Sequence, residues 1–563
     1  MRVLSFNDIS FTFPHCAKPT VDHVTFACEP GEFCVLCGPT GSGKTTLLSC
    51  AKPELTPFGE LRGERCLGAR NLEDFSPIES AQQLGYVLQS PTAQLVTDTV
   101  WHELAFGLEN LGIPSNEIRR RVAETAQFFG MQQWFTRKVS ELSGGQKQAL
   151  NVASIMAMQP EILLLDEPTS QLDPIAAKEF LTMLKRINSE LGCTILIVEH
   201  RLDDVLPLAD RVMFMEEGRL RFEGTPEKFA HYVSTQAPEF EIYLPTATQI
   251  SGQACAFTVK DARVALAERV NSGALLSNVA NDAITRPFEV PEAHASEAEG
   301  ATPKELALEA RAVWYRYDRK DEPIIKGLSL KLETGTIHGI VGGNGSGKTT
   351  LLHLLSQGVK PLKGRIAQRT DLRCGLLSQD PQTMFVRDSV LEDLCEALPA
   401  ATDATHVAHT QLKAFGIDHL AHQHPYDLSG GEMQKVALAK LMLIDPDIIL
   451  LDEPTKGLDP AAKKDCGALL QALKQQGKTI GLVSHDLDFV ARYADTCSLL
   501  FNGEITSTAP AHDFFLHNTF YTTSTYRVTR NLLDGCVTLD DFFALKAQSS
   551  CEATYESAQV EHV

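Results

Sequence analysis

The residues with the clearest capacity for chemistry form a glycine-rich loop that ends in a lysine and a threonine. The loop reads Gly38, Pro39, Thr40, Gly41, Ser42, Gly43, Lys44 and Thr45, and Thr46 follows it. An apolar run at 33–36 precedes the loop and Leu47 and Leu48 come after it, so it is expected to join a strand to a helix. Glycines let backbone N–H groups turn toward an anion, and a helix N-terminus adds partial positive charge. The loop therefore predicts a phosphate site in which Lys44 reaches the β- and γ-phosphates of ATP and Thr45 holds Mg²⁺.

The same loop recurs 304 residues later, so the chain is built twice. The second copy reads Gly342, Gly343, Asn344, Gly345, Ser346, Gly347, Lys348 and Thr349, and Thr350 follows it. The alternative is a glycine-rich turn that binds no ligand. The complete motif argues against this alternative in one copy, and its repetition argues against it more strongly. We expect Lys348 and Thr349 to repeat the roles of Lys44 and Thr45.

Each copy also contains an uninterrupted apolar run that ends in an Asp-Glu pair. The runs at 162–165 and 448–451 lead directly into Asp166-Glu167 and Asp452-Glu453. Such a run is typical of a strand buried on both faces of a parallel sheet. In a chain with phosphate-binding loops, Asp166 and Asp452 are expected to hold Mg²⁺, and Glu167 and Glu453 to polarise the attacking water. Either Asp-Glu pair alone could instead cap the N-terminus of a helix. The occurrence of the same pair in both copies argues against that alternative.

Four further polar residues end expected strands near these carboxylates. Gln89 and Gln379 could sense Mg²⁺ and the attacking water through their amides, although a strand-end glutamine is more often simply solvated. His200 and His485 follow the strands that come after the two carboxylate pairs. A lone histidine there is more often structural, but at this position we expect a contact with the γ-phosphate.

A third repeated segment opens a helix in each copy. The two versions are Leu142-Ser143-Gly144-Gly145-Gln146 and Leu428-Ser429-Gly430-Gly431-Glu432. A serine hydroxyl and free backbone N–H groups at a helix start can bind an anion. Because each phosphate loop already has its own helix, this second helix suits the nucleotide held by the other copy. Two copies facing head-to-tail would bury two ATP molecules, with ATP binding closing the pair and hydrolysis releasing it.

With these motifs in place, both copies resemble ATP-binding-cassette (ABC) nucleotide-binding domains, over about residues 1–232 and 306–515. The resemblance implies an α/β fold with two P-loop NTPase domains. Each would have a RecA-like core, a small antiparallel β subdomain and a helical subdomain. Residues 233–305 are then expected to be a linker and 516–563 a C-terminal tail.

The same resemblance assigns the remaining nucleotide contacts. It implies that Phe13 and Tyr317 stack on adenine. It also implies that Ser143 and Gly145 complete the site of Lys348, while Ser429 and Gly431 complete the site of Lys44. Two residues depart from the family pattern, since Ala149 stands where arginine is usual and Glu432 replaces the usual glutamine. Neither removes a catalytic group, so two competent ATPase sites are expected.

A narrower resemblance is carried by residues 85–91, 94–100 and 103–112, and more weakly by 453–459 and 518–523. These segments are similar to the ATPases of energy-coupling-factor importers, which take up vitamins or cobalt and nickel ions. The resemblance implies a transmembrane coupling protein and a small membrane substrate-binding subunit as partners. The chain would then lie at the cytoplasmic face of the membrane. Unequal docking grooves are expected near 89–111 and 379–398, with Leu95 and Phe385 as candidate contacts.

The helical pattern between about 100 and 135 places a stripe of apolar residues at helical spacing, which predicts core packing: Trp101, Leu104, Ala105, Leu108 and Leu111. The lysine-to-glutamine spacing is 45 residues in the first copy and 31 in the second, from Lys44 to Gln89 and from Lys348 to Gln379. The excursion between these positions, at 53–90 in the first copy, is therefore expected to be antiparallel and to be trimmed in the second.

The composition argues against several classes of function and location. The 563 residues carry 51 Lys and Arg against 72 Asp and Glu, a net charge of −21 that argues against a surface built to grip nucleic acid. No apolar window approaches the 18 residues of a membrane span, and residues 1–8 lack the apolar core of a signal peptide. The 14 scattered cysteines indicate reduced thiols in a cytosol, and Cys34 and Cys37 are expected to be strand packing.

Two other kinds of tandem ABC protein are alternatives to an energy-coupling-factor ATPase. Translation factors that act on ribosomes join their halves by a basic linker, whereas residues 231–305 hold 5 Lys and Arg against 10 Asp and Glu. Monosaccharide-importer ATPases resemble pairs with an impaired second site, whereas the second copy here keeps its catalytic groups. A histidine-rich stretch at 406–424 is expected to be a solvated helical surface, so no metal is predicted beyond Mg²⁺ with ATP.

Overall fold

The computed structural model describes residues 3–14, 16, 18–272, 305–320, 322–398 and 403–548. The chain divides into two units. Unit 1 comprises Met1–Gln249 and Gln253–Thr258, and unit 2 comprises Ile250–Gly252 and Val259–Val563. Within the described residues, no helix is both long and apolar enough to cross a membrane.

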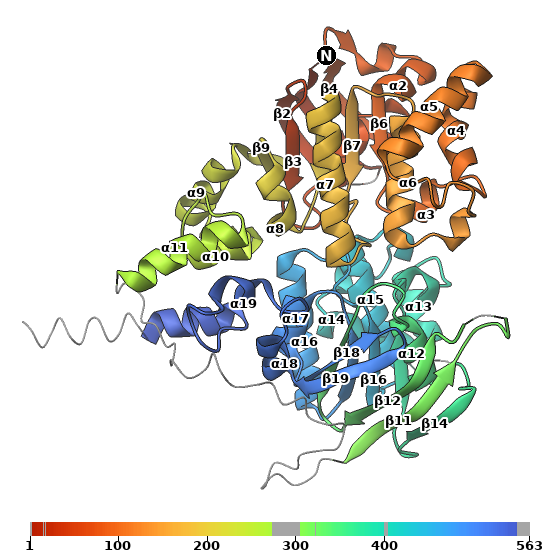
Figure 1. Ribbon diagram of the computed structural model, residues 1–563, viewed down its shortest axis with the longest axis vertical. Coiled ribbons are helices and arrows are strands. Elements are labelled where there is room, and N and C mark those ends of the chain that lie inside the picture. The colour runs from red at the N-terminus through yellow and green to blue at the C-terminus, as the bar shows by residue number, and fades with distance from the viewer. Residues whose placement is uncertain are drawn as a thin grey trace, which may run out of the picture. The chain divides into compact units, whose positions relative to one another are not determined.

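Each unit is built on a six-stranded sheet, and the two sheets have the same strand order. Helices pack against each sheet (Figure 1). In unit 1 the order is β10-β9-β3-β8-β7-β6, and in unit 2 it is β19-β18-β13-β17-β16-β15. Neighbouring strands are parallel except at the edges, where β10 and β19 run antiparallel to β9 and β18. The unit 1 strands are β3 (Phe33–Cys37), β6 (Leu84–Val87), β7 (Ile162–Asp166), β8 (Thr194–Val198), β9 (Arg211–Glu216) and β10 (Arg219–Gly224). The unit 2 strands are β13 (Ile337–Val341), β15 (Cys374–Leu377), β16 (Ile448–Asp452), β17 (Thr479–Val483), β18 (Thr496–Phe501) and β19 (Glu504–Pro510).

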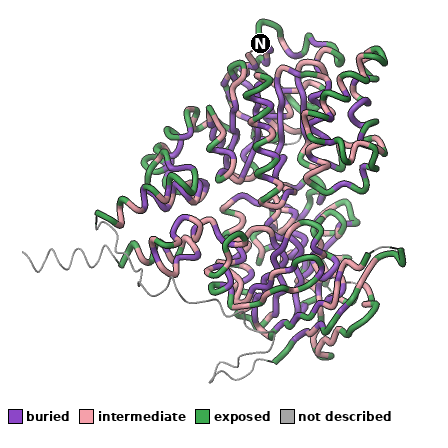
Figure 2. Tube along the Cα trace, viewed as in Figure 1, coloured by how far each residue is buried: buried purple, intermediate pink, exposed green. Residues whose placement is uncertain are grey.

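The central strands are buried on both faces, as their uninterrupted apolar runs predict (Figure 2). Along β3, Phe33, Val35 and Cys37 face one core while Cys34 and Leu36 face the other. The two cysteines of this C-x-x-C therefore point to opposite faces, and burial raises the pKa of Cys37 to about 12. The prediction that they serve strand packing is confirmed.

A smaller antiparallel sheet accompanies each core. In unit 1 it contains β1 (Leu4–Thr12), β2 (Val21–Cys28), β4 (Glu60–Leu67) and β5 (Arg70–Asn71). In unit 2 it contains β11 (Leu306–Tyr315), β12 (Ile325–Glu333) and β14 (Lys363–Gln368). Unit 1 inserts β5, a 3₁₀ turn at Leu72–Asp74 and α2 (Pro77–Gln83) before β6, whereas β14 is followed directly by β15. This insertion explains why the spacing is shorter in unit 2.

Helices cover the sheets and form a separate helical region in each unit. The unit 1 helices are α1 (Lys44–Cys50), α3 (Pro91–Gln94), α4 (Val100–Asn110), α5 (Ser115–Phe128), α6 (Gly144–Met156), α7 (Pro174–Leu191) and α8 (Leu202–Val205). The unit 2 helices are α12 (Lys348–Leu355), α13 (Val390–Glu396), α14 (Ala404–Ala414), α15 (Gly430–Met442), α16 (Pro460–Gln475) and α17 (Leu487–Tyr493). Leu104, Ala105 and Leu108 lie in the core between α4, α5 and α6, as predicted. The prediction for Trp101 was wrong, because its position at the first turn of α4 leaves its side chain exposed.

Short helical segments follow the edge strand of each unit. They are α9 (Pro226–Gln236), α10 (Thr246–Ser251) and α11 (Val259–Asn271) after β10, and α18 (Ala511–His517), α19 (Ser524–Thr529) and a helix at 539–548 after β19. In each set a threonine hydroxyl donates to a backbone carbonyl further along the chain, from Thr248 to Ala256 and from Thr529 to Cys536. Helices thus occupy the first part of the predicted linker 233–305 and much of the predicted tail 516–563. The rest of the predicted linker, 273–304, lies outside the described residues.

Candidate nucleotide sites

The last glycine of each phosphate-binding loop has a backbone conformation that residues with a side chain rarely adopt. Gly43, the N-cap of α1, has φ 94°, and a Cβ there would lie 2.5 Å from the Thr20 carbonyl oxygen. Gly347 has φ 100° at the N-cap of α12. Left-handed backbone of this kind is readily adopted by glycine alone. The glycines therefore set the sharp entry from strand to helix that places each lysine at the first turn.

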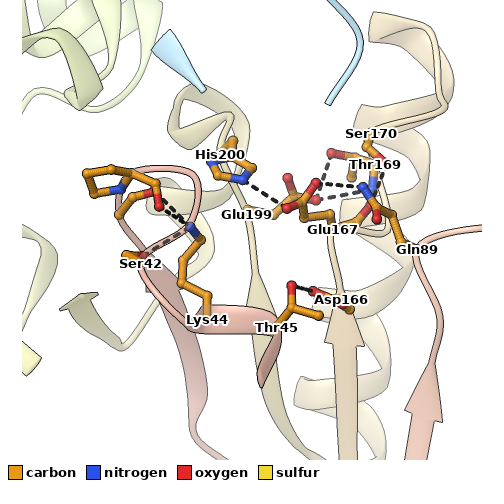
Figure 3. Close-up of polar contacts among 12 residues, drawn as sticks. Ser42, Lys44, Thr45, Gln89, Asp166, Glu167, Thr169, Ser170, Glu199 and His200 are labelled. Carbon is orange, nitrogen blue, oxygen red and sulfur yellow. Dashed lines mark hydrogen bonds and ion pairs between the residues drawn. The ribbon is translucent and has the colours of Figure 1, made fainter. Parts of the chain in front are cut away.

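The side chains of Lys44 and Lys348 each fold back and bind backbone carbonyls of their own loop. Lys44 Nζ donates to the carbonyl oxygens of Gly38 at 3.0 Å and Pro39 at 2.7 Å (Figure 3). Lys348 Nζ donates to the equivalent carbonyls of Gly342 and Gly343, each at 3.0 Å. Both ammonium groups are largely buried, so charged phosphate oxygens would compete well for the same donors.

The aspartates at the ends of β7 and β16 lie beside the loop threonines. Thr45 Oγ1 donates to Asp166 Oδ1 at 3.1 Å, and the Thr349 hydroxyl lies close enough to Asp452 to oppose the rise in the pKa of that carboxyl. Burial raises the pKa of Asp166 to about 7, with a smaller contribution from Glu167, and burial also raises the pKa of Asp452. A buried carboxylate next to a hydroxyl is an oxygen donor set that suits Mg²⁺. The residues present therefore fit the cation predicted for each site.

In unit 1 the predicted catalytic residues come together in one cluster (Figure 3). His200 Nε2 lies 2.8 Å from Glu167 Oε1, and Gln89 Nε2 donates to Glu167 Oε2 at 2.9 Å. Glu167 itself has φ 42°, an uncommon value for a residue with a side chain. The structure thus joins a glutamine, a glutamate and a histidine that are spread over more than 100 residues of sequence.

Unit 2 builds the same cluster with different contacts. The His485 backbone N–H donates to Glu453 Oε2 at 3.0 Å, and His485 Nε2 lies 3.3 Å from Glu453 Oε1. Burial raises the pKa of Glu453 to about 7. A cavity of about 310 Å³ is lined by Ile324, Asn344, Gly345, Gly347, Lys348, Thr349, Thr350, Gln379, Asp452, Glu453 and His485. Residues predicted from separate motifs therefore surround one space large enough for the phosphates of a nucleotide.

The two predicted adenine-stacking aromatics differ in environment. Phe13 packs edge-on against Phe11 with ring centroids 5.0 Å apart and is partly buried. Tyr317 is exposed, and its hydroxyl pairs with the Thr350 hydroxyl at 3.1 Å. The Tyr317 ring also packs edge-on against Tyr315, with ring centroids 5.2 Å apart, so the two aromatics differ in exposure and not in this contact. The adenine contact itself stays a prediction for both residues.

The predicted signature serines are helix N-caps with reciprocal capping bonds. Ser143 N donates to Gln146 Oε1 at 3.0 Å, and Gln146 N donates back to Ser143 Oγ at 3.3 Å. Ser429 and Glu432 form the same box at the start of α15. Glutamate and glutamine serve equally as the third residue of such a box, which explains why Glu432 can replace the usual glutamine.

The sequence analysis missed one residue of the unit 1 cluster. Glu199, between β8 and His200, is buried and accepts two hydrogen bonds at Oε1 from Thr169, from its backbone N–H at 3.1 Å and its hydroxyl at 2.7 Å. An acidic residue directly after the apolar run at 194–198 was the available signal. Its counterpart in unit 2 is Ser484.

The histidine-rich stretch contributes no part of these sites. His409 Nδ1 lies 2.8 Å from Asp418 Oδ1, both partly exposed. Across the described part of the chain, no three His, Cys, Asp or Glu side chains are grouped so as to hold a metal ion.

Comparison with known proteins gives matches over both units. The family model described as "ABC transporter" matches residues 21–170 and 325–456. A "Putative ABC transporter ATP-binding protein" of Bacillus thuringiensis subsp. konkukian (strain 97-27) is 39% identical over 554 residues, covering 95% of this chain and 97% of that protein. The "Putative HMP/thiamine import ATP-binding protein YkoD" of Bacillus subtilis (strain 168) is 30% identical over 515 residues, covering 89% of this chain and 90% of that protein. Among solved structures, cbiO1 from Clostridium perfringens, part of the ABC transporter complex cbiONQ, aligns with a TM-score of 0.38 at 27% identity, over 42% of this chain and 96% of that one.

Proposed function

The chain belongs to the ABC transporter ATP-binding family, and from that premise we propose that it is the motor of an energy-coupling-factor importer. It is an ATPase with two ABC domains in one polypeptide. The proposed cargo is a micronutrient, either a vitamin or a cobalt or nickel ion. The relative named for HMP/thiamine import supports the vitamin class.

In the proposed reaction, Lys44 and Lys348 bind the β- and γ-phosphates with the backbone N–H groups of their loops. Asp166 and Asp452, each with its neighbouring threonine hydroxyl, would hold Mg²⁺, and Gln89 and Gln379 would complete its surroundings. The cation would neutralise charge that develops on the phosphate oxygens.

The attack by water depends on the glutamates. Glu167 and Glu453 each accept a proton from the attacking water and orient it toward the γ-phosphate. His200 and His485 hold these carboxylates at 2.8 and 3.3 Å and contact the γ-phosphate as it leaves. The raised pKa of Glu453, about 7, suits a group that takes up and returns a proton near neutral pH.

Both ATP sites are proposed to be composite. Lys44 would share its nucleotide with Ser429 and Gly431, and Lys348 would share its nucleotide with Ser143 and Gly145. The support is that each signature serine starts a helix, so its hydroxyl and the following N–H groups form an anion-binding end. Closure on ATP and release after hydrolysis would then move the two units together and apart.

The contact with the membrane partner is proposed to lie just after each glutamine. In unit 1 the buried Glu103 accepts hydrogen bonds from the backbone N–H groups of Val96 and Thr97 and from the Thr97 hydroxyl. In unit 2 the buried Asp393 accepts from the backbone of Val386 and Arg387. Both loops are thereby fixed around an internal carboxylate and keep an exposed valine at their tip.

These exposed valines carry the docking proposal. Val96 is 67% exposed and Val386 69% exposed, at equivalent positions seven residues after Gln89 and Gln379. Beside the unit 1 loop lies a groove of about 350 Å³ lined by Thr92, Leu95, Thr97, Asp98, Lys138, Val139, Ser140 and Lys147. An apolar tip on a rigid loop beside a groove suits a cytoplasmic helix of a membrane protein.

Affinity capture of the tagged full chain from detergent-solubilised membranes of its own cells tests this function. We expect two integral proteins to be captured, one large coupling protein and one small subunit, and ATP-dependent uptake of a vitamin or metal ion when the three are placed in vesicles. Capture of ribosomes in place of membrane proteins would contradict the proposal and favour a translation factor.

A further inference from the structure

Three consecutive residues at the end of β8 hold the turn that carries Glu167. The Val198 carbonyl accepts from the Glu167 backbone N–H at 3.0 Å. Glu199 binds Thr169, and His200 binds the Glu167 side chain. The turn is therefore attached to the sheet at its first residue, at its third residue and through its catalytic side chain. Figure 3 shows the second and third of these contacts.

Unit 2 supplies a natural comparison for the middle contact. The Val483 carbonyl accepts from the Glu453 backbone N–H at 2.9 Å, and His485 binds Glu453, so the outer two contacts are kept. In place of Glu199 stands Ser484, whose hydroxyl lies 3.3 Å from the Thr455 hydroxyl. Glu199 receives two hydrogen bonds from Thr169, at 2.7 and 3.1 Å, where unit 2 has this single longer one.

The Glu199 side chain lies in surroundings that disfavour a carboxylate. The residue is only 2% exposed, and burial raises the pKa of Glu199 to about 7, with Thr169 opposing the rise and Glu167 adding to it. Burying such a group is unfavourable unless its hydrogen bonds are made. Its oxygen can accept from Thr169 whether or not the carboxyl carries a proton, so the contact persists in both forms.

We propose that Glu199 is a positioning residue for ATP hydrolysis at the site built on Lys44. It fixes Thr169, and through Thr169 it fixes the turn that orients Glu167 toward the attacking water. In the Lys348 site the single longer contact between Ser484 and Thr455 takes its place, so the two sites differ in how their catalytic glutamates are held. The inference depends on the proposed catalytic role of Glu167.

Steady-state ATPase kinetics of the full chain with Mg²⁺ and ATP test the proposal. Glu199→Ser installs the unit 2 residue, and we expect it to lower kcat at least about twofold while KM for ATP changes less than about twofold, because nucleotide binding does not involve the turn. Glu199→Gln keeps an oxygen acceptor and should retain most of the wild-type kcat. Ser484→Ala, the matched change in unit 2, should have the smaller effect.

Thr169→Val provides a second variant that does not depend on the folding of Glu199→Ser. It removes the hydroxyl donor and keeps the backbone N–H, so we expect a fall in kcat with KM unchanged. An unchanged kcat in both Glu199→Ser and Thr169→Val would overturn the inference, as would an equal loss of kcat in Glu199→Gln and Glu199→Ser.

Glu167→Gln separates this inference from the proposed function. If Glu167→Gln leaves kcat unchanged, the proposed catalytic role of Glu167 fails. If Glu167→Gln lowers kcat and Glu199→Ser does not, the proposed function stands and only the positioning role of Glu199 fails.

Discussion

The imidazole of His200 lies 2.8 Å from the carboxylate of Glu167, although the two residues follow different strands of the unit 1 sheet, β8 and β7. Unit 2 repeats the pair with His485 and Glu453 at 3.3 Å. In each unit the strand that ends just before the glutamate is the parallel neighbour of the strand that ends before the histidine. Adjacent parallel strands end at the same edge of a sheet, so the pairing follows from strand order alone.

Substituting both glutamates should stop turnover without preventing binding. In Glu167→Gln with Glu453→Gln the amides no longer accept a proton from water, while the lysines proposed to bind phosphate are unchanged. We expect ATP affinity within about threefold of wild type and ATPase activity reduced at least about 100-fold, measured by nucleotide titration and phosphate release. Near wild-type hydrolysis in the double variant would exclude both residues from the role.

The composite pairing of the two sites predicts a difference between two double variants. Lys44→Ala with Ser143→Ala places one change in each proposed site, so both sites should lose function. Lys44→Ala with Ser429→Ala places both changes in the Lys44 site and should leave the other site able to bind ATP. Counting bound ATP per chain distinguishes them, with about one fewer molecule bound in the first variant than in the second. Equal binding and equal turnover would rule out the head-to-tail pairing.

The structure changes which residues should be substituted to test docking. Phe385 is buried in the unit 2 core and Leu95 packs against the helical core of unit 1, so charging either would disturb folding. The exposed valines at the loop tips, Val96 and Val386, are better positions for charged substitutions. Val96→Asp and Val386→Asp should each weaken association with the membrane partner at least about tenfold, because a buried valine contact is worth about 1.5 kcal/mol or more.

Exposed apolar residues away from the loops give matched controls for the docking test. Ile78→Asp on α2 and Leu362→Asp before β14 change side chains that are also exposed. We expect them to leave capture of the partner and nucleotide binding unchanged. Full transport activity in the Val96→Asp, Val386→Asp double variant would show that these tips do not form the contact.

His338 predicts a dependence of stability on acid pH. On β13 its Nε2 pairs with the Ser498 hydroxyl and its Nδ1 with the Thr496 hydroxyl, each at 2.8 Å, and burial lowers the pKa of His338 to about 4. Between pH 6.5 and 4 the unfolded chain binds a proton that the folded chain does not, so the free energy of unfolding falls as pH falls. The loss should total about 3 kcal/mol at pH 4.

Denaturant unfolding between pH 7 and 4 measures this effect. His338→Gln keeps a neutral polar side chain and should flatten the pH dependence by that amount. His512→Gln, at an exposed histidine, is the control and should keep the wild-type slope. If His338→Gln shows the same slope as wild type, His338 is not the group responsible.

Much of the candidate site could be predicted because its parts are local motifs. The loops at 38–45 and 342–349 need their glycines, lysine and threonine in one stretch, and the apolar runs before Asp166 and Asp452 identify strands buried on both faces. The spacing from lysine to glutamine also predicted correctly that the excursion in unit 2 is shorter. These features depend on neighbours in sequence, so the sequence by itself determined them.

Tertiary structure decided the features that depend on which side chains turn inward. Glu199 and Thr169 are 30 residues apart and meet only because β7 and β8 are adjacent. A run such as Phe385-Val386 is apolar throughout, and only packing buries the phenylalanine and exposes the valine. Side-chain direction is set by the fold around each residue. For that reason the sequence determined which residue types make up the candidate sites, while the tertiary structure decided how each proposed catalytic glutamate is held.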